Sequence, residues 1–415
     1  MAINRGKDKR QSHFREFHMP QHSPRRSLAT CCAAHGLHDG LSDINYVLLP
    51  ILAQAFNLSL VQVGSIRSAW RAATSLFEIP AGLLAERFGA RNLLAFGTAC
   101  SGFAFIALGQ AAGFGAILLT LFFAGFGSAF QHPLCSTVIS RVYPEAGRRA
   151  ALGTYNFSGD VGKFALGGAV SILFIAGVPW QVPVMTFGGL ALAGALAILV
   201  LLKGADGHSR PVASTSGAGR RSSGWGIRHQ RGFIALCLIE IIDSSTRTGF
   251  LTFIAFLMIA KNLPAGWAAL SVPLVMVGGM AGKLACGFLA ERLGISRTIV
   301  ITEVATGAGI LLMLVVPDVA AYLLLPLIGV PLNGTSSVLY ATVGDLVERD
   351  RLPRVFGLFY TLSSVCSLIV PLLFGAIGDM IGIIPTMALI GLLVFLTLPL
   401  CLILKPALAS HQTAL

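Results

Sequence analysis

Twelve apolar runs, each long enough to cross a lipid bilayer as a helix, dominate this sequence. A transmembrane helix needs roughly 20 consecutive, mainly apolar residues, and runs of this length recur with charged or turn-forming residues between them. Hydrophobic residues make up 55% of the chain and charged residues 12%, whereas a soluble domain has about 25% charged residues. The sequence therefore predicts an all-α membrane protein with twelve transmembrane helices.

The runs form two sets of six, separated by a polar segment. The first set lies at 29–55, 61–84, 92–110, 116–140, 150–176 and 182–202. The second set lies at 232–259, 266–289, 298–316, 320–346, 354–379 and 383–404. Between them, 203–231 is rich in Gly, Ser and Arg, which is typical of a flexible linker. We therefore expect six-helix bundles at 29–202 and 232–404, with tails at 1–28 and 405–415.

The basic residues fall almost entirely on one side of this topology. With a cytoplasmic N-terminus, 24 of the 30 lysine and arginine residues lie in cytoplasmic tails and loops, and only Lys261 lies in an outside loop. This bias predicts that both termini are cytoplasmic, in a plasma membrane that we expect to be the bacterial inner membrane. It also explains the net charge of +12 without a nucleic-acid partner.

A loop motif recurs at the same place in both halves. Its first copy is GLLAERFGAR and its second is GFLAERLGISR. The matched residues are Gly82, Glu86, Arg87, Gly89 and Arg91 in the first copy, and Gly287, Glu291, Arg292, Gly294 and Arg297 in the second. A second match at nearly the same offset, 148–157 with 353–362, indicates parallel repeats. That arrangement is expected of a transporter whose site lies between two halves.

The motif has a physical logic at a helix end. Gly82 is expected to let two helices approach closely, and Gly89 permits a tight reversal into the next span. Glu86 can face the N-terminus of a neighbouring helix, and the arginines can pair with it or with lipid phosphate. Glu78 and Lys283 lie within two turns of the two copies. We therefore assign both copies to a gate. Glu78 and Lys283 are assigned to the same gate, with contact to the substrate as the alternative.

The repeated motif resembles the signature of the major facilitator superfamily, and the resemblance covers the whole chain. In that family the acidic position is usually Asp, whereas both copies here have Glu. The resemblance implies twelve helices in two bundles that rock about a central cavity. It also implies that spans 1, 4, 7 and 10 line the cavity and that spans 3, 6, 9 and 12 face lipid. Span 9 carries one charge, Glu303.

A finer resemblance lies in spans one and four. AHGLHDG at 34–40 and AGFGSAFQHP at 124–133 resemble strings of fosmidomycin-resistance-type efflux proteins. His35 and Asp39 match the first string, and His38 stands where that pattern has Asn. In the second string Gln131 is inserted before His132, and the acid that follows the proline is missing.

Ionisable residues inside the spans are functional candidates because burying them in lipid is costly. The candidates for proton coupling are Asp39, Asp43, His35, His38, Glu240 and Asp243. A carboxyl group in a poorly hydrated cavity can take up and release a proton as the cavity changes face, and histidines can extend such a relay. A purely structural role for the histidines is the alternative.

A second group of ionisable residues is expected to contact substrate. It comprises Arg67, Arg71, His132, Asp160, Lys163 and Arg247. The arginines suit an anionic or phosphonate-like substrate, because a planar guanidinium forms paired hydrogen bonds. The embedded acids nearly balance them, so the charge of the substrate stays open. Asp160 with Lys163, and Asp243 with Arg247, could instead form purely structural pairs.

These features predict a secondary transporter that exports a small molecule by proton antiport. A proton-linked importer of a small organic anion is the alternative, and a transporter-like membrane sensor is a remote one. No enzymatic motif occurs in the sequence, and we expect no cofactor and no metal site. The expected partners are a small-molecule substrate, protons and the lipid bilayer. We expect the protein to be a monomer.

Overall fold

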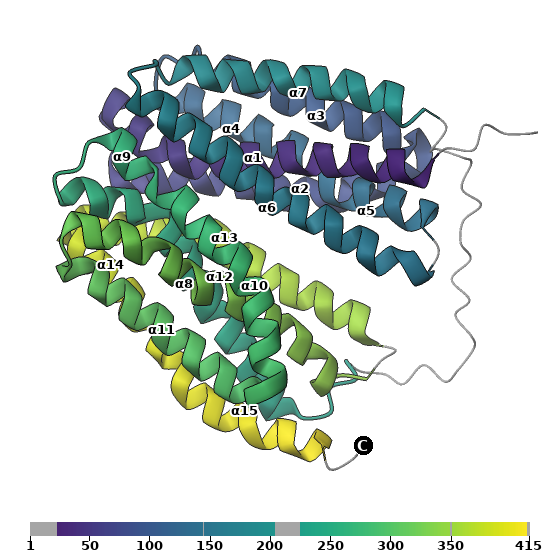
Figure 1. Ribbon diagram of the computed structural model, residues 1–415, viewed down its shortest axis with the longest axis vertical. Helices are drawn as coiled ribbons and strands as arrows, with labels where there is room; N and C mark the ends of the chain where they lie inside the picture. Colours follow the sequence, from purple (N-terminus) through teal and green to yellow (C-terminus); the bar gives the residue numbers. More distant parts are fainter. Residues whose placement is uncertain (1–22, 144, 204–224, 349–350, 413–415) are drawn as a thin grey trace, which may run out of the picture.

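A computed structural model describes residues 23–143, 145–203, 225–348 and 351–412, and nearly all of them are helical (Figure 1). The first half contains α1 (Pro24–Phe56), α2 (Leu60–Phe88), α3 (Ala90–Leu108), α4 (Phe114–Ser128), α5 (Gln131–Val142), α6 (Glu145–Ile175) and α7 (Gln181–Leu201). The second half contains α8 (Gln230–Ala260), α9 (Ala265–Ala269), α10 (Ser271–Leu293), α11 (Ile295–Val315), α12 (Asp318–Leu346), α13 (Leu352–Ile381), α14 (Ile383–Leu393) and α15 (Thr397–Gln412).

These helices confirm the predicted twelve spans in two halves. Three spans are each built from two helices in succession, namely α4 with α5, α9 with α10, and α14 with α15. Most of the expected linker and N-terminal tail lies outside the described residues. Helix α1 begins at Pro24 and α15 runs to Gln412, so both terminal spans extend into the expected tails.

The three spans that carry most of the buried charged residues are also the least apolar. Within the described ranges, nine helical stretches are long and apolar enough to cross a membrane by composition alone. The remaining spans are α1, α2 and α8, with 33, 29 and 31 residues. They are long enough to cross, but their ionisable side chains lower their hydropathy. Such side chains are tolerated in a membrane where they face the protein interior.

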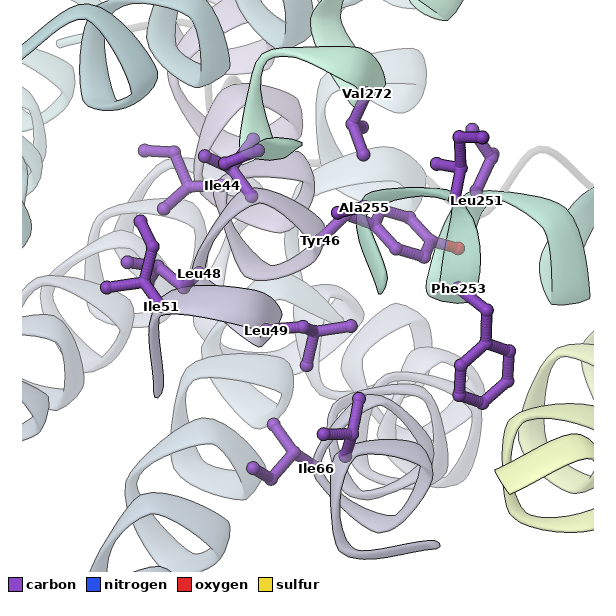
Figure 2. Close-up of a cluster of buried hydrophobic side chains, with 14 of the residues drawn as sticks. Ile44, Tyr46, Leu48, Leu49, Ile51, Ile66, Leu251, Phe253, Ala255 and Val272 are labelled. Atoms are coloured by element: carbon purple, nitrogen blue, oxygen red, sulfur yellow. The ribbon is translucent and has the colours of Figure 1, made fainter. Parts of the chain in front are cut away.

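The two halves share one apolar core at only one end of the molecule. We call the end that holds residues 203 and 225 the linker end, and the opposite end the far end. At the far end, Tyr46 and Leu49 of α1 lie in one cluster with Leu251 of α8 (Figure 2). At the linker end each half has its own separate cluster. The halves are therefore packed together at the far end and apart at the linker end (Figure 1).

Helices α2 and α13 make the tightest far-end closure. The carboxylate of Asp379 accepts hydrogen bonds from the backbone N–H groups of Leu60 at 2.7 Å and Val61 at 2.9 Å. An acidic side chain at a helix N-terminus is stabilising, because it meets unpaired N–H groups and the positive end of the helix dipole. A side chain at Gly64 would overlap the backbone of Pro371. Only glycine allows this approach.

Small residues also set the packing within each half. A Cβ atom at Gly162 of α6 would overlap the backbone of Gly36 of α1, and one at Gly278 of α10 would overlap that of Pro326 of α12. Close backbone approach at small residues is the usual way in which membrane helices associate. The first of these contacts holds α6 against α1, and therefore sets the position of Lys163 beside Asp39.

The packing role expected of Gly82 is wrong in this conformation. A Cβ atom at Gly82 or Gly287 would meet no atom within 4 Å, so neither glycine mediates a helix contact. Gly89 and Gly294 have φ angles of 81° and 85°, as a tight reversal requires. The side chain of Glu86 lies outside the described residues. Four other charged motif residues are exposed at the linker end: Arg87, Glu291, Arg292 and Arg297.

Candidate functional site

A polar cavity of about 300 Å³ lies between the two halves. This volume is at the lower end of those found for small-molecule sites. The ionisable residues that line it are Asp39, Asp43, Arg67, Arg71, His132, Asp160, Lys163, Arg247 and Lys283. Eight of these nine were expected from the sequence to act in transport. They come from both halves, as a site for alternating access requires.

Asp39 is the centre of a cluster that we call the Asp39 cluster, formed with His35, His132 and Lys163. The Asp39 carboxylate lies 3.0 Å from the Lys163 ammonium, 3.2 Å from His35 Nε2 and 3.5 Å from His132 Nε2. Helix α1 places His35 and Asp39 one turn apart on one face. His35 is buried, whereas the side chain of His132 is 48% exposed and faces the cavity.

The hydrogen bonds of His35 determine where its proton lies. Its Nδ1 is 2.6 Å from the carbonyl oxygen of Tyr155, and its ring stacks on the Tyr155 ring with 4.0 Å between centroids. A carbonyl oxygen only accepts, so Nδ1 carries a hydrogen. His35 Nε2 therefore faces Asp39 either as a bare lone pair, which the carboxylate repels, or with a second proton in the contact. This geometry favours the binding of a further proton between His35 and Asp39.

His38 lies apart from this cluster. Its Nε2 is 2.9 Å from the hydroxyl of Thr98 on α3, and that hydroxyl donates to the carbonyl oxygen of Leu94 at 2.7 Å. Because the hydroxyl hydrogen is already used, His38 Nε2 is the donor in its own bond. His38 therefore fixes α1 against α3, which is a structural arrangement.

Asp160 connects the Asp39 cluster to the other half of the molecule. Its carboxylate lies 3.4 Å from the Lys163 ammonium on the same helix and 2.7 Å from the Lys283 ammonium on α10. The expected local pair of Asp160 with Lys163 is therefore the weaker of two contacts. Lys283, assigned to the gate from its sequence position, lines the cavity instead. The sequence could not indicate this, because the contact joins residues 123 positions apart.

Arg67 and Arg71 project from α2 without a carboxylate partner in the described part of the chain. The Arg67 guanidinium lies 3.8 Å from the centre of the Tyr46 ring, and one of its nitrogens donates weakly to the carbonyl oxygen of Ser42 at 3.5 Å. The Nε atoms of both arginines are buried and have no hydrogen-bond partner. Asp43 also lines this region, and no ion pair within 4.0 Å involves it among the described residues. Two guanidinium groups with free donors can form charge-assisted hydrogen bonds to an anion.

Three acidic residues lie in the interior of the second half, behind the cavity wall. Glu240 and Asp243 of α8 are buried, and Asp243 lies 3.4 Å from Arg247, which lines the cavity. Glu303 of α11 is the third, at 1% exposure. Its span was expected to face lipid, but this side chain faces the protein interior. A single charged residue in a span does not indicate which face of the helix is buried, so the sequence could not predict that Glu303 faces the interior.

One group of side chains has the separation of metal ligands. Ligand atoms of His35, Asp39 and His132 lie within 4.8 Å of one another. The ammonium of Lys163 already lies 3.0 Å from Asp39, so a cationic group of the protein itself compensates this carboxylate. A metal ion at this point would have to displace Lys163.

The sequence model described as Major Facilitator Superfamily matches residues 31–342 and 236–414. The chain is 26% identical over 373 residues to an uncharacterized MFS-type transporter of Bacillus subtilis (strain 168), with 86% of this chain and 88% of the relative covered. It is 23% identical to a probable sulfoacetate transporter of Cupriavidus necator, covering 81% of this chain and 83% of the relative. It is 27% identical to the fosmidomycin resistance protein of Escherichia coli (strain K12), covering 42% of this chain and 41% of that one.

Solved structures share the arrangement of helices. A bacterial homolog of the human lysosomal transporter Spinster, crystallised in an inward-facing and occupied conformation, superposes with a TM-score of 0.72 at 16% identity. The superposition covers 94% of this chain and 97% of that one. At this identity the similarity concerns the fold.

Proposed function

Because this chain belongs to the Major Facilitator Superfamily and is a multi-pass membrane transporter, we propose that it carries a small organic anion together with a proton. The two halves would expose the cavity to each side of the membrane in turn. The observation that carries the proposal is the meeting, in one cavity, of the Asp39 cluster and two arginines that have no carboxylate partner among the described residues.

The charge balance of the cavity supports an anionic substrate. Five cationic side chains line it against three carboxylates. Both lysines are already in ion pairs with Asp39 and Asp160. The guanidinium groups of Arg67 and Arg71 therefore remain for a ligand. Their planar forks match the oxygens of a carboxylate, sulfonate or phosphonate. One relative is named as a probable sulfoacetate transporter, which agrees with this class.

The Asp39 cluster supports coupling to a proton. A proton that enters the contact between His35 and Asp39 removes a negative charge from the cavity wall. It thereby strengthens the binding of an anion nearby, so the proton and the anion each increase the affinity for the other. With a proton in this contact, the Asp39 carboxylate shares its charge with His35 and holds Lys163 less tightly, and Lys163 can then compete with Lys283 for Asp160. In this way one proton weakens an ion pair between the halves.

A second candidate is export by proton antiport. The match to the fosmidomycin resistance protein and the two strings around Asp39 and His132 favour it. In this mechanism the proton and the substrate would occupy the cavity alternately, and protonation from outside would favour release there. The two candidates differ in the direction in which a proton gradient drives the substrate.

We place the protein in the bacterial inner membrane as a monomer, with the linker end in the cytoplasm. The bias of lysine and arginine towards the linker end supports this orientation. In that orientation the conformation described here opens to the cytoplasm, because the halves are apart at the linker end.

Flux measurements in proteoliposomes test the proposal. Purified protein is reconstituted, and uptake of sulfoacetate, a simple phosphonate and fosmidomycin is followed with the pH gradient directed inward, outward or absent. Anion symport predicts that uptake rises with an acidic outside. Uptake that rises with an acidic inside supports antiport. Equal uptake under all three conditions contradicts both candidates.

A further inference from the structure

Three carboxyl groups meet a single guanidinium in the interior of the second half. Glu240, Asp243 and Glu303 are exposed by 0%, 4% and 1% of their surface. Arg247 lies 3.4 Å from Asp243 Oδ2 and is itself a cavity-lining residue. The carboxyl groups come from α8 and α11, two helices that approach each other at few positions and are both packed against α14 and α15. The group therefore lies between two spans and one residue away from the cavity.

Most of these carboxyl oxygens have no donor. Among the described residues, both oxygens of Glu240, Oδ2 of Asp243 and Oε1 of Glu303 are buried without a hydrogen-bond partner. The hydroxyl of Ser363, which acts on Glu240, is engaged with the hydroxyl of Ser244 at 3.0 Å. The carboxyl groups of Asp243 and Glu303 lie within hydrogen-bonding reach of each other. Two carboxylates in contact repel, so this contact requires a proton.

The surrounding titratable groups supply no further positive charge. They are Tyr340 of α12, Tyr360 and Cys366 of α13, Cys237 of α8 and Cys401 of α15. Tyrosine and cysteine side chains are neutral near pH 7. Arg247 is thus the one cation acting on the three acids in the described part of the chain. Full ionisation would leave two uncompensated negative charges in a buried site, which is strongly unfavourable.

We propose that Asp243 and Glu303 form a carboxyl–carboxylate pair that binds one proton. Glu303 carries this proton and donates a hydrogen bond to the ionised Asp243. Asp243 stays ionised because its other side faces Arg247. Glu240 is neutral. The site is a second proton-binding site, in the half that does not contain the Asp39 cluster. A role of this site in coupling rests on the proposed function. The binding of a proton at this site does not depend on it.

The pair can influence the cavity through Arg247. When Glu303 keeps its proton, the guanidinium has one ionised partner, Asp243, and can still offer donors to an anion. Loss of that proton places a second negative charge near Arg247 and draws it away from the cavity. Glu303 is therefore a positioning residue for Arg247, although it does not line the cavity itself.

Infrared spectroscopy of the purified full-length protein tests the site without any substrate. Protonated carboxyl groups absorb separately from carboxylates. We expect the wild type at pH 7 to show the protonated-carboxyl band, and Glu303→Gln to lose part of it. Glu348→Gln removes an exposed carboxyl outside the spans and should leave the band unchanged.

Either of two results would overturn the proposal. One is a wild-type spectrum at pH 7 without a protonated-carboxyl band, a measurement that needs no variant. The other is a band of equal area in wild type and Glu303→Gln, with both proteins monodisperse. Should Glu303→Gln fail to fold, Glu303→Asp keeps the carboxyl group and should keep the band, and the wild-type result still decides. Failure to find anion transport would leave all these spectra unchanged, so the two proposals fail separately.

Discussion

The carboxylate of Asp160 on α6 lies 2.7 Å from the ammonium of Lys283 on α10, so this ion pair joins the two halves across the cavity. The same carboxylate is 3.4 Å from Lys163, whose ammonium is 3.0 Å from Asp39. A continuous series of charges thus leads from the Asp39 cluster to the second half. Through it, a change of protonation at Asp39 can alter the contact between the halves.

Breaking this pair should shift the balance between conformations. Lys283 is 45% exposed, so screening by water limits the pair to about 0.2–1 kcal/mol. Asp160→Asn should therefore change the ratio of conformations by up to about fivefold. Spin labels at Gly153 and Gly357, where an added side chain meets no atom within 4 Å, would report the distance between the linker ends of α6 and α13.

The control for that experiment is the reversed pair, Asp160→Lys with Lys283→Asp. It should restore the wild-type distance distribution to a large extent. Distributions that are identical in wild type and Asp160→Asn would show that the pair does not set the conformational balance.

His35 and His38 offer a matched comparison within one helix. His35 contacts Asp39, whereas His38 bonds to Thr98 on α3. His35→Gln should remove the dependence of flux on the pH gradient. His38→Gln should keep that dependence and lower stability by about 1–3 kcal/mol, because a buried hydrogen bond is disturbed. Flux measurements and thermal unfolding of both variants provide the check, and loss of coupling in His38→Gln alone would reverse the assignment.

Arg67 and Arg71 should determine the affinity for substrate. Lysine keeps the charge but cannot form the paired hydrogen bonds of a guanidinium. Loss of one charge-assisted bond costs about 1.5–3 kcal/mol, so Arg67→Lys or Arg71→Lys should raise KM by about 10- to 100-fold. Initial rates over a range of anion concentrations measure this change. Arg141→Lys, at an exposed position of the linker end, is the control and should keep the wild-type KM.

The contact between α1 and α6 should tolerate no side chain at Gly162. Gly162→Val places new atoms against the backbone of Gly36, which should cost about 1–3 kcal/mol of stability or separate the helices. Gly168→Ala on the same helix meets no atom within 4 Å and should be neutral or stabilising. Thermal unfolding in detergent compares the two. Equal midpoints would mean that the helices adjust without cost.

The twelve spans could be predicted from the sequence because their signal is local. An apolar run of about 20 residues reports its own environment, and the repeated motif relates the two halves. The candidate residues of the cavity were also found locally, because an ionisable residue inside an apolar run stands out. Helix α1 is too polar to be identified as a span by hydropathy alone. It could still be predicted, because its apolar run is interrupted mainly by the ionisable residues that mark the cavity.

The pairing of these residues could not be predicted, because it depends on which helices are neighbours. Lys163 has Asp160 three positions away, yet its shorter contact is to Asp39 on another helix. The sequence places Lys283 in the gate because its distance along the chain from the motif is the only indication of its position that the sequence contains. The direction of Glu303 required the same knowledge of neighbouring helices. The packing expected of Gly82 depends in addition on the conformation, because the two halves are apart at the linker end.

Simultaneous measurement of anion and proton movement tests the central claim most directly. Proteoliposomes with a pH-sensitive dye inside receive sulfoacetate outside, with no initial pH gradient and with the membrane potential clamped. The account predicts internal acidification that accompanies anion uptake in the wild type. It also predicts that Asp39→Asn moves the anion without acidification. Anion uptake by the wild type with no proton movement, or acidification that persists in Asp39→Asn, would contradict it.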